Sequence, residues 1–397
     1  MAHIVVVTVG TRGDVVPYLA LGGALQVAGH RTTIATHGAL RSLVERAGLG
    51  FAALPVEFDT DDPRTLTSAR LARTLAHRWL DIGRAVADAS KDADLLLLAA
   101  MGWIGYHVAE ARGVPSMGAY LQPLEPTREF PPPLLTTRSL GGWGNRAAAR
   151  GFRLLGQAPF ARATAALRRE LGLSPLGPVA TFRRMAAEEW PVLHGFSPVV
   201  VPPPADWPAY RPVIGYWWPP AGGVLSPRLQ RFLDDGEPPV FIGFGSMSAP
   251  GLGELVESAL GRLRRRVVVQ RGAAGLGSGR PDVLVVGDEP HDALFPRVAA
   301  VVHHAGAGTT AAALRAGVPA VCVPFTADQP FWAQRVAALG AGPPPLRRRG
   351  LTPQRLAGAI GVAEGYSPGA ASVAARLATE DGVARAVAEI VRRLPVP

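Results

Sequence analysis

The 397-residue chain is poor in cysteine, lysine and long apolar runs. Its one cysteine, Cys322, excludes a disulfide framework and a metal site built from several thiolates. Because Cys322 lies in an apolar strand pattern, we expect a buried structural thiol rather than a nucleophile. The longest apolar run, residues 95–104, is shorter than the roughly 20 residues that a membrane-spanning helix needs. With no signal peptide visible, we expect a soluble cytoplasmic protein with at most peripheral membrane contact.

Arginine and lysine outnumber the acidic residues, and the formal net charge is +10. Such an excess of positive charge is suited to binding nucleic acid, an anionic membrane surface or an anionic ligand. The basic residues are scattered arginines, Lys91 being the one lysine, and their abundance is typical of the coding bias of a high-GC bacterium, which we take to be an actinobacterium. The densest clusters, 264–266 and 347–349, have no aromatic-rich platform around them, so we expect no nucleic-acid partner. The histidines are dispersed and no paired acidic motif is present, so we expect no metal and no cofactor.

Strand and helix patterns alternate twice along the chain, each time from an apolar strand that ends in a Gly-rich turn. This alternation predicts an α/β fold with two Rossmann-like, doubly wound parallel-sheet domains. The Pro- and Trp-rich stretch after residue 202 is the best linker candidate. We therefore expect a first domain over 1–204, a linker over 205–220 and a second domain over 221–377, with a final helix within 378–397 that can pack back on the first domain.

The most informative stretch is 303–310, which reads HHAGAGTT and joins an apolar strand to a helical pattern. Glycines let the backbone approach a phosphate closely, and the N–H groups of the first helical turn point at it. Downstream, Asp328 and Gln329 offer short polar side chains that suit vicinal hydroxyls. A phosphate site beside a hydroxyl site predicts a nucleotide-sugar pocket.

Five segments, in order, carry a resemblance to a known family: 10–22, 194–208, 243–247, 289–304 and 302–336. The last resembles the donor signature of family 1 glycosyltransferases, and the nearest branch is that of bacterial and fungal sterol glucosyltransferases and glycopeptide-antibiotic glycosyltransferases. The resemblance covers nearly the whole chain. It implies the GT-B fold, in which two Rossmann-like domains face each other across an active-site cleft.

The resemblance assigns His304 to a contact with the donor phosphate. A neutral imidazole can donate a hydrogen bond there, and a protonated imidazole would also neutralise the charge of the leaving nucleoside diphosphate. His303 is better interpreted as a packing residue. Asp328 and Gln329 would hold the sugar, although Asp328 also suits a helix N-cap. The diphosphate cradle is Gly306, Gly308, Thr309 and Thr310, and the other donor-site candidates are Thr11, Arg12, Ser246, Arg271, Pro290 and His291.

Two donor-site features stay open. Ser246 suits either a phosphate contact or an N-cap. Pro290 and His291 match the segment along the nucleobase, but residues 270–275 hold no tryptophan where family members often stack the base on an aromatic ring. Arg271 would stack through its guanidinium plane or face solvent. The donor is therefore UDP-glucose or a dTDP-sugar.

Asp14 is the candidate general base, because an acceptor hydroxyl that attacks the anomeric carbon must lose its proton. The matching segment of the glycopeptide branch carries an aspartate in this role, and a helix N-cap is the alternative interpretation. For the acceptor we single out Trp103, Phe130 and Trp143, aromatic residues that suit a flat lipophilic molecule but that individually suit core packing as well.

The predicted activity is an inverting, metal-independent O-glycosyl transfer from UDP-glucose to a hydroxyl of a sterol, triterpenoid or polyketide-type acceptor. The alternatives are a dTDP-deoxysugar transferase of antibiotic biosynthesis, a nucleotide-sugar epimerase and a non-catalytic nucleotide-sugar or lipid-binding protein. The oligomeric state is left open.

Overall fold

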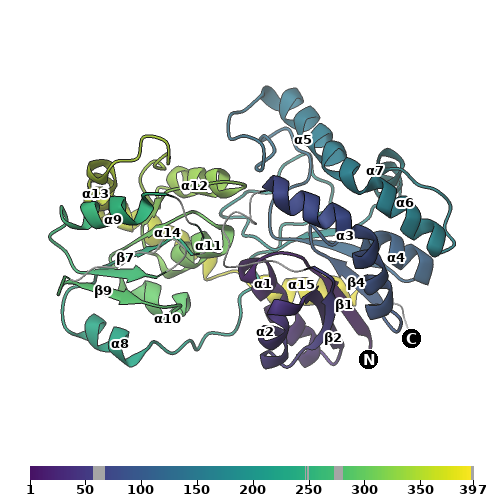
Figure 1. The fold of residues 1–397 in the computed structure, drawn as a ribbon, viewed down its shortest axis with the longest axis horizontal. Helices are drawn as coiled ribbons and strands as arrows, with labels where there is room; N and C mark the ends of the chain where they lie inside the picture. The colour runs from purple at the N-terminus through teal and green to yellow at the C-terminus, as the bar shows by residue number, and fades with distance from the viewer. Residues whose placement is uncertain (57–67, 246, 248–249, 272–279, 395–397) are drawn as a thin grey trace. The chain divides into compact units, whose positions relative to one another are not determined.

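Atomic contacts divide the chain into two compact units (Figure 1). Unit 1 comprises Met1–Pro220 and Asp381–Pro397, and unit 2 comprises Ala221–Glu380. The structure, a computed structural model, describes residues 1–56, 68–245, 247, 250–271 and 280–394. In the described part of the chain no helix combines the length and the apolar character needed to cross a bilayer.

Unit 1 is built on a six-stranded parallel sheet with the order β3-β2-β1-β4-β5-β6. The order reverses direction between β1 and β4, which is the switch point at which doubly wound sheets bind ligands. The two central strands are buried along their whole length, and this explains their unbroken apolar runs. The strands are β1 (His3–Val7), β2 (Arg31–His37), β3 (Gly50–Leu54), β4 (Leu95–Leu98), β5 (Ser116–Tyr120) and β6 (Val192–His194).

Alternate residues of β1 face two separate cores. Val5 and Val7 pack with helices α3, α4 and α6, whereas Ile4 and Val6 pack with α1, α2 and α15. The sheet is therefore covered on both faces, as the predicted doubly wound fold requires. The helices of unit 1 are α1 (Arg12–Val27), α2 (Arg41–Arg46), α3 (Ser68–Ala89), α4 (Gly105–Arg112), α5 (Gly141–Gln157), α6 (Ala161–Glu170), α7 (Pro178–Ala187) and α15 (Gly382–Val391), with 3-10 turns η1 (Gly38–Leu40) and η2 (Ala158–Phe160).

The Pro-rich stretch 205–220, which we expected to be a linker, is part of unit 1. It runs beside β6: His194 N donates to the Pro212 carbonyl at 3.0 Å, and Ile214 N donates to the His194 carbonyl at 3.1 Å. Trp217 is buried and meets Tyr18 edge-on, with ring centroids 5.6 Å apart. The stretch therefore extends the first unit, and the division falls after residue 220.

Unit 2 is a five-stranded parallel sheet with the order β11-β10-β7-β8-β9. Its direction reverses between β7 and β10, so both units have the same type of switch point. Its strands are β7 (Val240–Gly243), β8 (Val267–Gln270), β9 (Val283–Val286), β10 (Ala300–His303) and β11 (Ala320–Cys322). Its helices are α8 (Pro227–Asp234), α9 (Leu252–Leu260), α10 (His291–Leu294), α11 (Ala307–Ala316), α12 (Gln329–Ala338), α13 (Pro353–Val362) and α14 (Ser367–Leu377), with 3-10 turns η3 (Phe295–Arg297) and η4 (Ala363–Tyr366).

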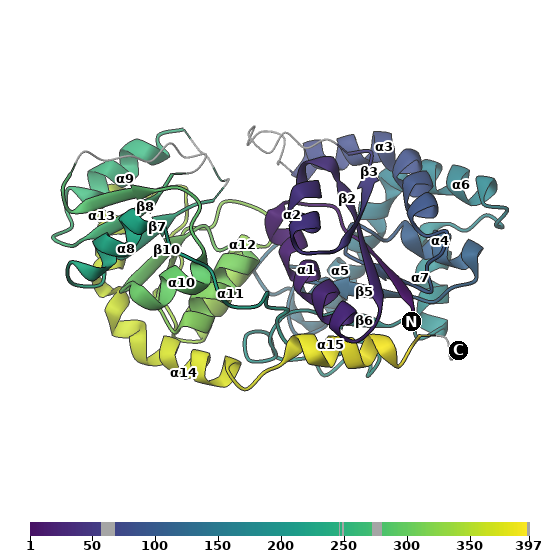
Figure 2. The same ribbon diagram turned by 90° about the horizontal axis from the view of Figure 1, so that it is seen from below.

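The last helix, α15, belongs to unit 1 and lies alongside α1 (Figure 2). Ile390 is fully buried in the core that α1 shares with the sheet, whereas the next residue, Val391, is 40% exposed. The side chain of Asp381 begins the helix by accepting a hydrogen bond from Ala384 N at 2.9 Å. The C-terminal helix is thus a structural part of unit 1.

We predict that Ile390→Ala destabilises unit 1 by about 2–5 kcal/mol, the usual cost of removing a fully buried aliphatic side chain. Hydrogen exchange should show lost protection in β1 and β4 but not in β7 and β10. The exposed neighbour provides the control, Val391→Ala, which should change protection little. Equal loss of protection in both sheets would contradict the assignment of α15 to unit 1.

Candidate active site

In unit 2, the predicted phosphate loop lies at the carboxyl end of β10, beside the switch point. Gly306 is the N-cap of α11, and the first bond within the helix runs from Thr310 N to the Gly306 carbonyl at 2.9 Å. The amides of residues 307–309 therefore precede the helical hydrogen-bond ladder and point out of the helix start. Such amides, at the positive end of a helix dipole, favour an anion.

The imidazole of His304 fixes the residue type at position 306. A Cβ atom at position 306 would lie 2.5 Å from His304 Nε2, so a residue larger than glycine would displace the ring from this position. Within the described residues, His304 Nδ1 and Thr310 Oγ1 are buried and have no hydrogen-bond partner. Buried polar atoms are rarely left unpaired, so each of these two atoms is a candidate contact for a polar ligand at the loop. Burial, assisted by His291, lowers the pKa of His304 to about 4, so the ring is neutral at physiological pH.

His303 is a packing residue. Its ring is fully buried, its Nδ1 accepts a hydrogen bond from Ala305 N at 3.0 Å, and its Nε2 lies 3.8 Å from Cys322 Sγ. Ala305 has a φ of 64°, a left-handed conformation that costs a non-glycine residue about 1–2 kcal/mol. His303 therefore holds the strained turn that leads from β10 into α11. Burial also raises the pKa of Cys322 to about 12, as expected for a structural thiol.

The candidate sugar-binding pair lies at the start of α12. Asp328 is the N-cap of this helix, and its Oδ2 accepts a hydrogen bond from Trp332 Nε1 at 2.8 Å. Gln329 is buried, and its Oε1 accepts from Phe325 N at 2.8 Å and from Thr326 N at 3.1 Å. Gln329 thus holds the loop after β11, and Asp328 is tied to α12 itself. The contact of both side chains with sugar hydroxyls stays a prediction.

The remaining donor-site candidates fall into three groups. Gly308 and Thr309 lie in the first turn of α11, where a Cβ at position 308 would meet open space. Arg271 is exposed directly after β8. Pro290 precedes α10 as its N-cap, and His291 stacks on Phe295 with ring centroids 4.3 Å apart. Ser246 lies outside the described residues.

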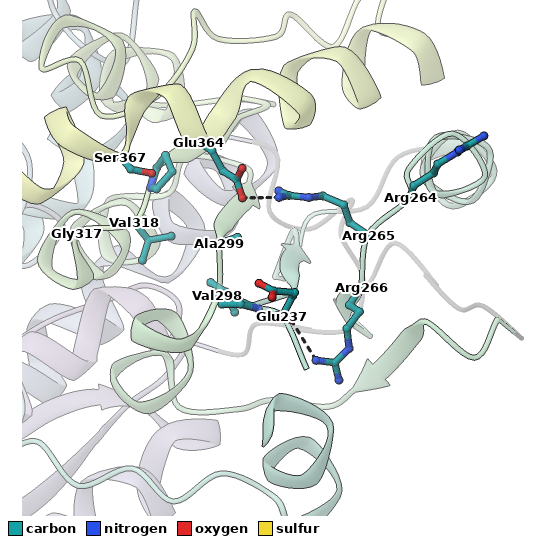
Figure 3. Close-up of a pocket in the computed structure, with 12 residues that line it drawn as sticks. Glu237, Arg264, Arg265, Arg266, Val298, Ala299, Gly317, Val318, Glu364 and Ser367 are labelled. Atoms are coloured by element: carbon teal, nitrogen blue, oxygen red, sulfur yellow. Dashed lines mark hydrogen bonds and ion pairs between the residues drawn. The ribbon is translucent and has the colours of Figure 1, made fainter. Parts of the chain in front are cut away.

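A cavity of about 810 Å³ in unit 2 is distinct from this loop (Figure 3). It is lined by residues that precede β7, β8, β10 and β11, so it lies at the amino edge of the sheet, opposite the loop after β10. Two of its three arginines are engaged: Arg265 pairs with Glu364 at 2.5 Å, and Arg266 donates to the Glu237 carbonyl at 3.1 Å. Parallel sheets bind ligands at the carboxyl edge, so this cavity is not the donor site.

In unit 1, Asp14 lies after β1 in the first turn of α1. Thr11 is the N-cap, and its N and Oγ1 donate to Asp14 Oδ2 at 2.8 and 2.9 Å. Asp14 is therefore not the N-cap that we considered: Thr11 is, and Asp14 is the third helical residue, which completes a capping box with it. This position is compatible with a role as base, because the residue is partly exposed. A Cβ at Gly10 would lie 2.5 Å from Asp14 Oδ2, so the carboxylate requires this glycine. Arg12, the first residue of α1, is exposed.

Desolvation by the surrounding protein raises the pKa of Asp14, and hydrogen bonds from Thr11 and Gln122 offset part of the rise. Gln122 was not among our candidates. Gln122 is the second residue after β5, in the irregular stretch 121–145. In the sheet, only β4 lies between β5 and β1. The signal that would have found it is a polar side chain just beyond the carboxyl end of a strand near the switch point.

Glu125, in the same loop, is a second residue that the sequence did not single out. Its buried carboxylate accepts hydrogen bonds from Arg153 of α5 at 2.9 Å and from Arg211 at 2.5 Å. Burial acts to raise the pKa of Glu125, but the two arginines outweigh it and hold the pKa below its usual range. This ion-pair cluster fixes the loop that carries Gln122.

The three acceptor candidates occupy different environments. Trp103 packs in the core against Trp79, with ring centroids 4.8 Å apart. Phe130 lies edge-on to Trp207 at 6.4 Å. Trp143 is 81% exposed in α5, with the Arg128 guanidinium 5.3 Å from its ring. The core location of Trp103 favours the packing interpretation for that residue, and an acceptor contact for any of the three stays a prediction.

Comparisons with known proteins agree with this architecture. The chain matches a "glycosyltransferase family 28 N-terminal domain" over residues 4–131 and an "erythromycin biosynthesis protein CIII-like, C-terminal domain" over residues 254–395. Sterol 3-beta-glucosyltransferase UGT80B1 of Arabidopsis thaliana is 34% identical, with 99% of this chain and 68% of that protein covered. A sterol 3-beta-glucosyltransferase of Neosartorya fischeri is 33% identical, with 99% of this chain and 29% of that protein covered. The chain thus spans about two thirds of the plant relative and under a third of the fungal one.

Among solved structures, the glycosyltransferase of kitacinnamycin has a TM-score of 0.73 at 21% identity, covering 99% of both chains. The calicheamicin glycosyltransferase CalG4 has a TM-score of 0.72 at 21% identity, covering 99% of this chain and 98% of that one. The predicted fold is confirmed: the two parallel-sheet α/β units have the GT-B fold of these structures. The chain belongs to the family 1 glycosyltransferases.

We predict that Gly306→Ala lowers nucleotide affinity at least about ten-fold, which corresponds to about 1.4 kcal/mol, because the added Cβ displaces the His304 ring. Calorimetric titration with UDP and with dTDP measures the loss. Gly358→Ala is the matched control, since its Cβ would meet open space on α13, and it should bind nucleotide like the unaltered chain. Unchanged affinity in Gly306→Ala would contradict the phosphate-loop assignment.

A second prediction concerns pH and stability. Because the folded-state pKa of Asp14 is raised, the stability linked to its protonated form is present at low pH and is lost as pH rises through that pKa. Asp14→Asn removes this pH-dependent loss of stability and keeps a side-chain oxygen that can accept a hydrogen bond from Thr11. Its melting temperature relative to the unaltered chain should therefore increase between about pH 4 and pH 7. A difference that shrinks or stays flat over this range would show that the Asp14 carboxyl is not desolvated.

Proposed function

We propose that the chain transfers glucose from UDP-glucose to a hydroxyl of a lipophilic small molecule, with inversion at the anomeric carbon and without a metal ion. The observation that carries the proposal is the pair of buried, unpartnered atoms His304 Nδ1 and Thr310 Oγ1 beside the free amides of α11. An acceptor of the sterol, triterpenoid or polyketide type is supported by relatives that are named sterol 3-beta-glucosyltransferases.

Asp14 is the general base of the proposed reaction. The acceptor oxygen forms a bond to the anomeric carbon as its proton passes to the Asp14 carboxylate. The bond from the anomeric carbon to the donor phosphate breaks at the same time, and the nucleoside diphosphate leaves with the electron pair. Desolvation makes the Asp14 carboxylate a stronger base than an ordinary aspartate, and Gln122 and Thr11 fix its orientation.

The leaving diphosphate is stabilised by the start of α11. The amides of residues 307–309 and the helix dipole favour negative charge, and the neutral His304 ring and the Thr310 hydroxyl each donate a hydrogen bond. Because these groups are fixed before the reaction, they stabilise developing charge without reorganisation. Metal independence is part of this proposal, and turnover that survives a chelator would support it.

The donor sugar has a second candidate. The Oε1 atom of Gln329 already accepts two backbone hydrogen bonds, from Phe325 and Thr326, so its capacity for further sugar hydroxyls is reduced. A deoxysugar carried by dTDP needs fewer such contacts than glucose does. A panel of UDP- and dTDP-linked sugars with one lipophilic acceptor distinguishes the two donors, and product formed without any acceptor would favour an epimerase.

We predict that Asp14→Asn lowers kcat by roughly two to four orders of magnitude, the usual contribution of a positioned base, while nucleotide affinity stays within about two-fold. Asp381→Asn is the matched control, because Asp381 also caps a helix, α15, and it should keep full turnover. His304→Ala should lower affinity and turnover together. Full turnover in Asp14→Asn would remove the base assignment, and nucleotide binding without turnover on any acceptor would favour a binding protein.

A further inference from the structure

Helix α5 and the loop before it expose an unusual amount of apolar surface. Half of the exposed large hydrophobic side chains among the described residues lie in this one segment of unit 1. Scattered exposed apolar residues are normal, whereas a concentration in one short segment makes that segment a candidate interaction surface. The members are Leu134 (39% exposed), Leu135 (57%), Leu140 (53%), Trp143 (81%), Phe152 (37%) and Leu155 (75%), and we call them the α5 patch.

The segment that carries the α5 patch contains charged side chains of one sign. Residues 130–169 contain seven arginines and no aspartate or glutamate. Arg138 and Arg150 are exposed, and neither has an acidic partner within the described part of the chain. Arg146 lies 3.8 Å from Asp206, a distance too long for a strong ion pair. Arg153 and Arg168 are paired with Glu125 and Glu110. The cations that accompany the apolar side chains of the patch are therefore Arg138, Arg146 and Arg150.

The patch is held in shape by the protein rather than carried on a loose tail. The buried Asn145 side chain accepts from Leu140 N at 2.8 Å and donates to the Arg128 carbonyl at 3.0 Å. Arg153, about two turns further along α5, is fixed by Glu125. These contacts join the loop to the first turns of α5, which lies at the upper edge of unit 1 in Figure 1.

We propose that the α5 patch docks on the surface of an anionic lipid bilayer. Leu and Trp side chains enter the boundary between headgroups and acyl chains, where an indole is especially well accommodated, and the arginines meet anionic headgroups. A nucleic acid would leave Leu135, Leu140 and Leu155 without a complementary surface. The proposal is independent of the donor sugar and of the role of Asp14.

The test is co-sedimentation of the full chain with phosphatidylcholine vesicles that contain or lack phosphatidylglycerol. We expect binding to the anionic vesicles that weakens as salt is added. Leu135→Ser/Leu155→Ser and Arg138→Gln/Arg150→Gln should each lower the bound fraction, by on the order of ten-fold in partition coefficient for the arginine pair. The matched control is Val224→Ser/Arg376→Gln, which alters exposed residues of unit 2 and should bind like the unaltered chain.

Two results would overturn the proposal. The unaltered chain could stay in the supernatant with anionic vesicles, or the patch variants could sediment as well as the unaltered chain. Sedimentation velocity without lipid identifies the competing occupant: a dimer that Leu135→Ser/Leu155→Ser converts to a monomer would make the patch a contact between copies of the chain. Because the altered side chains are exposed, the melting temperatures should stay near that of the unaltered chain, and they identify any variant whose loss of binding comes from misfolding.

Discussion

Burial of two parallel sheets on both faces is the constraint on which the rest of the structure depends. Strands such as β1 and β10 are covered by helices and have no room for polar chemistry along their length. Functional groups can therefore stand only where the strands end. Asp14 follows β1, and His304 follows β10, each beside the switch point of its own sheet. The same rule explains why the cavity at the amino edge of unit 2 is not the donor site.

Desolvation sets the chemical character of both proposed reacting groups. It raises the pKa of Asp14 and lowers the pKa of His304 to about 4, so each group is shifted toward its neutral form. In unit 1 the consequence is a more basic carboxylate, and in unit 2 it is a neutral hydrogen-bond donor. Glycines at positions 10 and 306 make this possible, because a Cβ at either position would collide with the group. The strained Ala305 adds a stability cost at the same loop.

Much of the architecture could be predicted from the sequence, because buried parallel strands and Gly-rich turns leave strong local patterns. The two sheets and the loop from His304 to Thr310 belong to this class. Contacts between distant segments leave no such pattern. Three sets of contacts depend on three-dimensional packing: the hydrogen bond from Gln122 to Asp14, the ion pairs of Glu125 with Arg153 and Arg211, and the backbone hydrogen bonds that Gln329 accepts. The stretch 205–220 had a linker-like composition, yet its backbone pairs with β6 and places it inside unit 1.

The anomeric configuration of the product tests the central claim most directly. If Asp14 activates the acceptor for a single in-line displacement, the α-linked donor must give a β-linked glycoside, because each displacement inverts the reacting carbon. Proton NMR of the purified product reports this through the coupling of the anomeric proton to its neighbour. A large coupling, for the β-glucoside, is the result that the account predicts. A small coupling, for the α-glucoside, would contradict the role given to Asp14.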